Sequence, residues 1–212
     1  MIVGVAQIVL NVADLDQACA PYLAEGWRET FSVRSIPNHA AKAGLQATCR
    51  SALDMVHLTP REGAAVELTR YEGAPPAGET VYEVDDHVRV HAAELERSRA
   101  FWHALGFFQR ADGLLEARAM LPGWRLALEL VRSDRVGPAT SVDADGCVLV
   151  TVLTTAIEPE LERLRRTGLL LRFTPSWTEQ IGTRTAVVAI VEGPSGELVE
   201  LLQAPRRAER DE

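Results

Sequence analysis

The sequence predicts an α+β fold of three tandem βαβββ modules, on three observations. The same order of elements, a strand, a helix and three strands, fits residues 1–72, 81–134 and 146–205. Stretches rich in proline and glycine separate these segments, and a repeat of this kind defines an architecture better than any single element. One module is too small to hide its sheet. We therefore expect modules to pair into cupped, mostly antiparallel half-barrels with helices on the outer face.

In the first module the elements follow from apolar periodicity. The β-branched stretch IVGVAQIVLNV predicts a strand, and DLDQACAPYLAEGW predicts a helix that ends at Gly26. Three more strands are expected in RETFSVRSI, LQATCRSALDMVHLT and AAVELTRY. The loop PNHAAKAG between the first two of these carries no readable signal for specificity.

The second and third modules repeat this order. In the second, YEVDDHVRVH predicts one strand, AAELERSRAFWHALGF a helix, and FQRADG, LLEARAML and GWRLALELVRS three strands. Val88 and Val90 of the first of these strands should pack under the helix. In the third, the strand CVLVTVLT and the helix IEPELERLRRTG precede strands in LLLRFTPSW, TRTAVVAIVEGPSG and ELVELLQA. Residues 206–212 are charged and predict a solvated tail.

Composition and charge narrow the class of protein. The chain has 212 residues, of which 47% are hydrophobic and 25% charged, as is ordinary for a globular protein. A net charge of -8 argues against nucleic acid and anionic membranes as partners. No apolar run is long enough to span a bilayer, and the N-terminus lacks the features of a signal peptide. Three widely spaced cysteines, Cys19, Cys49 and Cys147, predict free thiols in a reducing, cytoplasmic compartment.

Polar side chains stand alone on one face of several predicted strands. The last strand of each module carries one glutamate among apolar or small neighbours: Glu67, Glu129 and Glu200. The first strands place Gln7 and His87 at a matching position, where the third module has Leu149 and no ligand atom. A buried glutamate is costly unless its charge is compensated. Taken singly, each of these residues is better explained by a half-solvated face or, for a glutamate, by an arginine partner than by a functional role.

Pairing of the first two modules would bring four of these side chains together at the centre of one sheet: Gln7, Glu67, His87 and Glu129. Carboxylate, amide and imidazole groups form a set suited to a divalent metal such as Zn, Ni, Co or Mn. Arg89 and His91 follow His87 on the same face, where they could orient an anionic substrate or act as acid and base. The alternative for both is a solvated strand end.

Over essentially its whole length, the chain resembles the vicinal oxygen chelate superfamily, the group of glyoxalases, bleomycin-resistance proteins and extradiol dioxygenases. The resemblance is carried by QIVLNVADLDQACAPYLAEGW with VELTRY, by HVRVHAAELERSRAFWHALGF with LALELV, and by VEGPSGELVELLQ. It implies metal ligands on the first and last strands of two paired modules, here drawn from Gln7, Glu67, His87, Glu129 and Glu200. It also implies a glyoxalase-like isomerase, lyase or epimerase.

In such an enzyme the metal is a Lewis acid on a small molecule with adjacent oxygen atoms, and a carboxylate moves a proton to or from an enolate. By position, Glu129 is the candidate base and Glu67 the alternative. An extradiol site needs two histidines and a carboxylate, whereas only His87 stands at a ligand position. The set therefore favours Zn, Ni, Co or Mn over Fe. The alternative function is a metal-free protein that binds or sequesters a small molecule.

The odd number of modules leaves two pairings open. Modules one and two give the fuller ligand set, with the third module pairing with its copy in a homodimer. Modules two and three would instead unite His87, Glu129 and Glu200 and leave the first module for the dimer contact.

Overall fold

The computed structural model describes the chain except residues 49, 74–79, 118–124, 135–139, 182–183 and 204–212. The predicted tail, parts of both linkers, the end of the strand expected in LLEARAML and the start of the strand expected in GWRLALELVRS lie outside the described residues. The α+β class is confirmed, since strands predominate over a few short helices and form two mixed sheets. No helix in the described part of the chain has the length and apolar character needed to cross a membrane.

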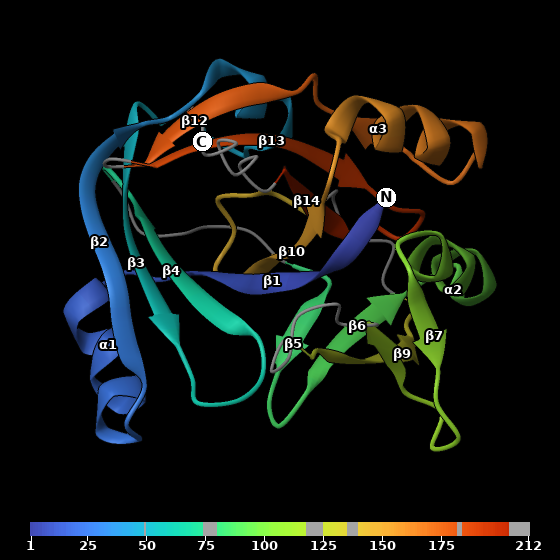
Figure 1. Cartoon of the computed structure of the whole chain (residues 1–212), viewed down its shortest axis with the longest axis horizontal. Coiled ribbons are helices and arrows are strands. Elements are labelled where there is room, and N and C mark those ends of the chain that lie inside the picture. The colour runs from blue at the N-terminus through green and yellow to red at the C-terminus, as the bar shows by residue number, and fades with distance from the viewer. Residues whose placement is uncertain (49, 74–79, 118–124, 135–139, 182–183, 204–212) are drawn as a thin grey trace, which may run out of the picture.

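Three segments of the chain contain the elements that Figure 1 labels. The first holds β1 (Ile2–Asn11), α1 (Leu15–Ala24), β2 (Arg28–Pro37), a 3-10 helix (Ala40–Leu45), β3 (Ala52–Thr59) and β4 (Ala65–Tyr71). The second holds β5 (Tyr82–Val84), β6 (Val88–Ala92), α2 (Leu95–Ala104), β7 (Phe107–Gln109), β8 (Leu115–Ala117) and β9 (Ala127–Arg132). The third holds β10 (Gly146–Thr154), α3 (Ile157–Arg166), β11 (Arg172–Phe173), β12 (Trp177–Ile181), β13 (Arg184–Glu192) and β14 (Leu198–Gln203).

One strand order recurs in the three segments: β1-β4-β3-β2, β6-β9-β8-β7 and β10-β14-β13-β11. In each, the strand that precedes the helix (β1, β6 or β10) is a parallel neighbour of the last strand of its segment. The boundaries of the three modules stay predictions. The shared order nevertheless defines equivalent positions in the three segments, which the site described below uses.

The first and third segments share one nine-stranded sheet because β1 pairs with β10 in antiparallel register. Both pairings expected from the sequence are therefore wrong. The second segment forms a separate five-stranded sheet, and β6, which corresponds to β1 and β10, is not free to pair in the same way. The short strand β5 pairs antiparallel with β6 and takes the edge that a partner module would need. A homodimer stays a prediction.

The stretch YEVDDHVRVH was expected to be one strand, but it forms the hairpin β5–β6. The chain turns at residues 85–87, where the amide of Asp85 donates to the carbonyl oxygen of His87 over 3.1 Å. Val88 and Val90 are fully buried in one core with Phe101 and Trp102 of α2, as the alternation predicts.

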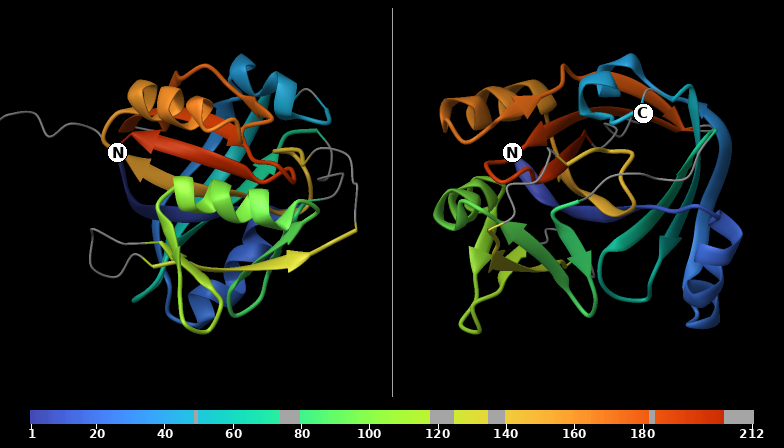
Figure 2. Two further views of the ribbon diagram at one scale, coloured as in Figure 1. Left: turned by 90° about the vertical axis from the view of Figure 1, so that its right-hand side faces the viewer. Right: turned by 180° about the vertical axis from the view of Figure 1, so that it is seen from behind.

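The nine-stranded sheet is curved, and it brings β12 at one end into contact with β2 at the other (Figure 1). Ile181 of β12 packs with Phe31 and Val33 of β2 in the same apolar cluster. The views in Figure 2 place the smaller sheet beside the large one, with α2 and α3 adjacent. Alternation along β4 divides the core between two faces. Val66 and Leu68 pack with α1, whereas Glu67 points to the opposite, inner face of the curved sheet.

Candidate functional site

Two glutamates occupy equivalent positions on the inner face of the curved sheet. Glu67 on β4 lies opposite Val9 on β1, and Glu200 on β14 lies opposite Thr151 on β10. Across the β1–β10 pair, Gln7 faces Thr151 and Val9 faces Leu149. The register therefore relates the two halves of the sheet by a local twofold, with Glu67 and Glu200 on either side of the central strand pair.

Each glutamate is held by a polar side chain of the neighbouring strand. Gln7 Nε2 donates to Glu67 Oε2 over 2.6 Å, and Thr151 Oγ1 donates to Glu200 Oε1 over 3.2 Å. Both glutamates line an internal cavity of about 30 Å³ together with Tyr71 and apolar side chains. A cavity of this size holds about one or two water molecules, so no organic ligand fits in it as it stands.

A lysine reaches the same cavity from the 3-10 helix. Lys42 is only 9% exposed, and its Nζ lies 3.7 Å from Glu179 Oε1 and 5.7 Å from the centre of the Trp177 ring. Burial alone lowers the pKa of Lys42, but Tyr71 and the carboxylates around it outweigh burial and leave that pKa raised. Lys42 therefore stays an ammonium ion inside the sheet.

The two glutamates are poised near neutral pH. Burial, followed by the charge of Glu200, raises the pKa of Glu67 to about 8, although Lys42 and Gln7 oppose the shift. Burial also raises the pKa of Glu200 to about 7, against the effect of Lys42. Because perturbed carboxyl groups that share a cavity are candidates for function, this cluster is one candidate site.

The donors around this cavity do not fit a divalent metal ion. The described residues contain no group of three or more His, Cys, Asp or Glu side chains placed to hold one. Gln7 turns its amide N–H toward Glu67, and the ammonium of Lys42 repels any further cation. With the ammonium of Lys42 in place, this donor set does not fit a divalent metal ion, and the metal centre expected from the sequence stays a prediction.

The other predicted site residues lie on the smaller sheet and are not brought to Glu67 or Gln7. His87 Nε2 lies 3.1 Å from Glu129 Oε2, and His87 Nδ1 lies 2.8 Å from Asp86 Oδ1. The hydrogen bond with Glu129 is the main cause that raises the pKa of His87. Arg89 pairs with Glu83 over 3.4 Å and also with Asp85, and His91 lies 3.1 Å from Glu83. These contacts form a surface network of ion pairs.

The sequence reasoning missed Lys42 and Glu179. Lys42 stands in a loop that shows no periodicity, and Glu179 lies in β12, a strand that the sequence analysis does not predict. A signal for Lys42 did exist: it is the one lysine of the chain, whereas the other 21 of the 22 lysine and arginine residues are arginines.

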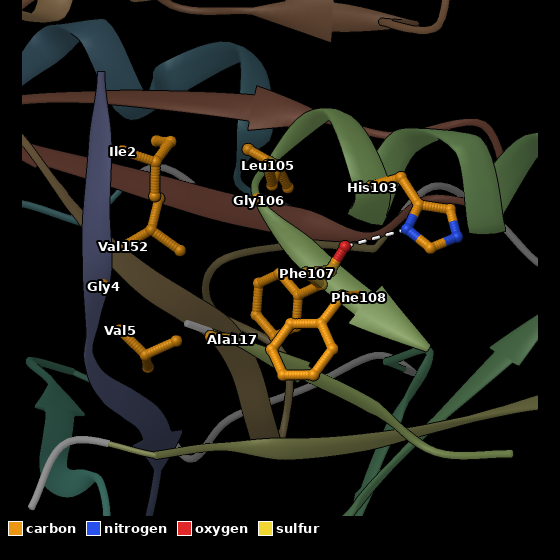
Figure 3. Close-up of a pocket in the computed structure, with 10 residues that line it drawn as sticks. All are labelled: Ile2, Gly4, Val5, His103, Leu105, Gly106, Phe107, Phe108, Ala117 and Val152. Carbon is orange, nitrogen blue, oxygen red and sulfur yellow. Dashed lines mark hydrogen bonds between the residues drawn. The ribbon is translucent and has the colours of Figure 1, made fainter. Parts of the chain in front are cut away.

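A larger pocket lies where the smaller sheet meets the curved one (Figure 3). It has a volume of about 440 Å³ and is lined by Ile2, Gly4, Val5, His103, Leu105, Gly106, Phe107, Phe108, Ala117 and Val152. The turn after α2 forms one wall. Its geometry is set by Gly106, whose φ of +88° favours glycine, and by His103 Nδ1, which donates to the Phe107 carbonyl oxygen over 2.8 Å.

No protein-family model and no curated protein matches this sequence. Among solved structures, methylmalonyl-CoA epimerase from Mycobacterium tuberculosis is 15% identical, with 97% of this chain and 91% of that chain covered and a TM-score of 0.48. A variant of the epimerase from Streptomyces coelicolor, in complex with 2-nitronate-propionyl-CoA, is 11% identical, with 96% and 99% covered and a TM-score of 0.44. A mutant of glyoxalase I from Zea mays is 16% identical, with 94% and 67% covered and a TM-score of 0.39.

With all three TM-scores below 0.5, no activity, substrate or metal is carried over from these proteins to this chain. These epimerases and the glyoxalase I are members of the vicinal oxygen chelate superfamily.

Proposed function

We propose that this chain binds a small, largely apolar molecule, without a metal ion, in the pocket between the smaller sheet and the β1–β10 pair. The observation that carries the proposal is the size and lining of this pocket. Its volume of about 440 Å³ lies within the range of small-molecule sites, roughly 300 to 1,000 Å³. The cavity between Glu67 and Glu200 is far smaller.

The lining indicates the class of ligand. Ile2 and Val5 of β1 lie across from Phe107 and Phe108 in Figure 3, so aliphatic and aromatic surfaces face the same space. No lining side chain carries a permanent charge, and the Nδ1 of His103 is already bonded to the backbone. A neutral molecule with an aromatic ring suits these walls, because its flat face can pack against the phenylalanine rings.

Filling the pocket should abolish this binding. Ile2 is a half-buried residue at the start of β1, and the change Ile2→Trp would place an indole ring in the space. We expect the affinity for N-phenyl-1-naphthylamine, a neutral aromatic probe, to fall about tenfold or more, a loss of about 1.4 kcal/mol. Fluorescence titration of the probe measures this.

The matched control is Leu23→Trp, which adds the same ring at an exposed position on α1, outside the pocket. This variant should bind the probe as the unchanged protein does. Equal weakening by both variants, or binding that Ile2→Trp leaves unchanged, would contradict the proposal.

The two buried glutamates of the curved sheet, Glu67 and Glu200, favour a second candidate function. In this function they transfer a proton to or from a small molecule. Two carboxyl groups with pKa values of about 8 and about 7 are matched to acid and base work at neutral pH. The substrate would have to displace the 3-10 helix, since a cavity of about 30 Å³ is too small for an organic molecule.

Hydroxyacetone in deuterium oxide is a suitable probe of this second function. The protein should speed the exchange of its carbon-bound hydrogens by about 100-fold or more over buffer, the usual scale of acid–base catalysis. Proton NMR measures the rate. Glu67→Gln should return the rate to that of buffer, whereas Glu62→Gln, an exposed position, should not. Exchange at the buffer rate in the unchanged protein would exclude this function for hydroxyacetone-like substrates.

A further inference from the structure

The geometry points to Lys42 as the built-in cation of the cluster formed by Glu67, Glu179 and Glu200. Its ammonium takes the place that a divalent metal ion would otherwise hold among these carboxylates, and its removal opens a metal site. This inference goes beyond the apolar pocket proposed above and does not depend on it.

The charges around the cavity support this role. The charges of all three glutamates raise the pKa of Lys42. Among the described residues that line the cavity, Lys42 is the only cation. Buried carboxylates need a compensating charge close by. The paired Glu179 is only 7% exposed, and Trp177 Nε1 donates to the same carboxylate, which fixes its position. The cluster thus has one positive group, and it is supplied by the chain itself.

The backbone that presents Lys42 is held from several sides. The imidazole of His39 stacks on Trp177, with ring centres 5.4 Å apart and an angle of 11°. Arg172 Nη1 donates to the carbonyl oxygen of Gly44 over 2.6 Å. Asp143 accepts hydrogen bonds from the amides of Ala47 and Thr48 over 2.7 and 2.9 Å. These contacts hold the loop that carries Lys42 against the sheet.

The residue type adds a second, independent observation. Arginine fills 21 of the 22 lysine and arginine positions in this chain, and lysine stands only at position 42. A lysine ammonium is a compact point charge, whereas a guanidinium is wide and planar. Lys42 lines the small cavity together with Glu67 and Glu200, where the compact group meets the carboxylates without the width of a guanidinium. Inside the sheet, the ammonium is the protein group closest in size and charge to a metal ion.

Lys42→Met should convert the cluster into a metal site. The carboxylates of Glu67 and Glu200 would remain, with Gln7 and Thr151 beside them, and no ammonium would repel a cation. We expect this variant to bind about one equivalent of Mn²⁺ or Zn²⁺ at least tenfold more tightly than the unchanged protein. The gain should disappear in Lys42→Met/Glu67→Gln. Calorimetric titration of chelator-treated protein measures both.

A single lysine permits a direct test in the unchanged protein. Lysine labelled with ¹⁵N at Nζ gives one side-chain ammonium signal, and paramagnetic Mn²⁺ broadens any signal close to it. Equimolar Mn²⁺ should leave the Lys42 signal sharp. Broadening of that signal, relieved by Glu67→Gln, would overturn the inference, because the metal and the ammonium would then share the cavity.

The inference can be tested even if the variants fail to fold. If Lys42→Met and the more polar Lys42→Gln both unfold, refolding on addition of Mn²⁺ supports the inference, and failure to refold counts against it. A folded Lys42→Met protein with no gain in metal affinity overturns it.

Discussion

Lys42→Met is expected to lower the free energy of unfolding by about 3 to 5 kcal/mol at pH 8, which is the usual result of removing one partner of a buried ion pair. The ammonium is almost fully buried, and its loss would leave Glu179 without its cationic partner. It would also remove the charge that opposes the rise in pKa of Glu67 and Glu200. Urea unfolding measures the change.

This loss should shrink as the pH falls, and the sign follows from the raised pKa values. Glu67 has a pKa of about 8 in the folded protein and an ordinary value of 4.5, so between these pH values the folded state binds the extra proton. Stability then declines as the pH rises from about 4.5 through about 8. Without the ammonium the decline becomes steeper, and at pH 5 to 5.5 the destabilisation should be markedly smaller than at pH 8.

Two controls separate the charge from the packing. Lys42→Met/Glu179→Gln removes both partners and should recover part of the stability that the single change costs. Arg110→Met removes a cation from an exposed ion-pair group, with side chains 42% and 46% exposed in the pair with Asp112, and should cost about 1 kcal/mol or less. A loss from Lys42→Met that does not depend on pH would show that packing, and not charge, explains the effect.

Strand alternation in the sequence was enough to place part of the site. A period of two puts Gln7 and Glu67 on the face away from the helix, and both lie on the inner face of the curved sheet. The same argument holds for Glu200 in the third module. Alternation is a local property of the backbone, so it can be read without knowledge of the partner strands.

The partners of the strands could not be read in this way. Which modules pair depends on which edge of β6 is free, and this edge is taken by a strand of only three residues, β5. Asp85 and Asp86 are residues that favour turns, and they mark the break between β5 and β6. The sequence therefore contains a sign of the turn. That this turn separates His87 from Glu67 follows only from how the strands of the two sheets pair.

The position of Lys42 could not be predicted from the local sequence pattern. The loop before β3 has no periodicity, so neither its 3-10 helix nor the direction of its lysine follows from local pattern. The contacts that fix it come from residues far along the chain, such as Asp143 and Arg172. In a site that is completed by a loop, the sequence therefore predicts only the residues that lie on strands.

The second large effect is expected at Gly193, in the turn between β13 and β14. A Cβ atom added there would lie 2.6 Å from Cε1 of Phe101 and 2.7 Å from Oε2 of Glu197. Phe101 is fully buried in the core that joins the two sheets, so its ring has no room to withdraw. We expect Gly193→Ala to cost about 3 kcal/mol or more, the upper part of the range for overpacked cores.

At about 2 to 4 °C per kcal/mol for a chain of this size, the midpoint of thermal unfolding should fall by roughly 6 to 12 °C. Gly44→Ala is the matched control, because its added Cβ meets nothing within 4 Å and its φ is not positive. Phe101→Leu in the Gly193→Ala background removes the clashing ring edge and should therefore cost less than it does alone. Independent, additive losses from the two changes would show that the contact between this turn and α2 does not limit the packing of the two sheets.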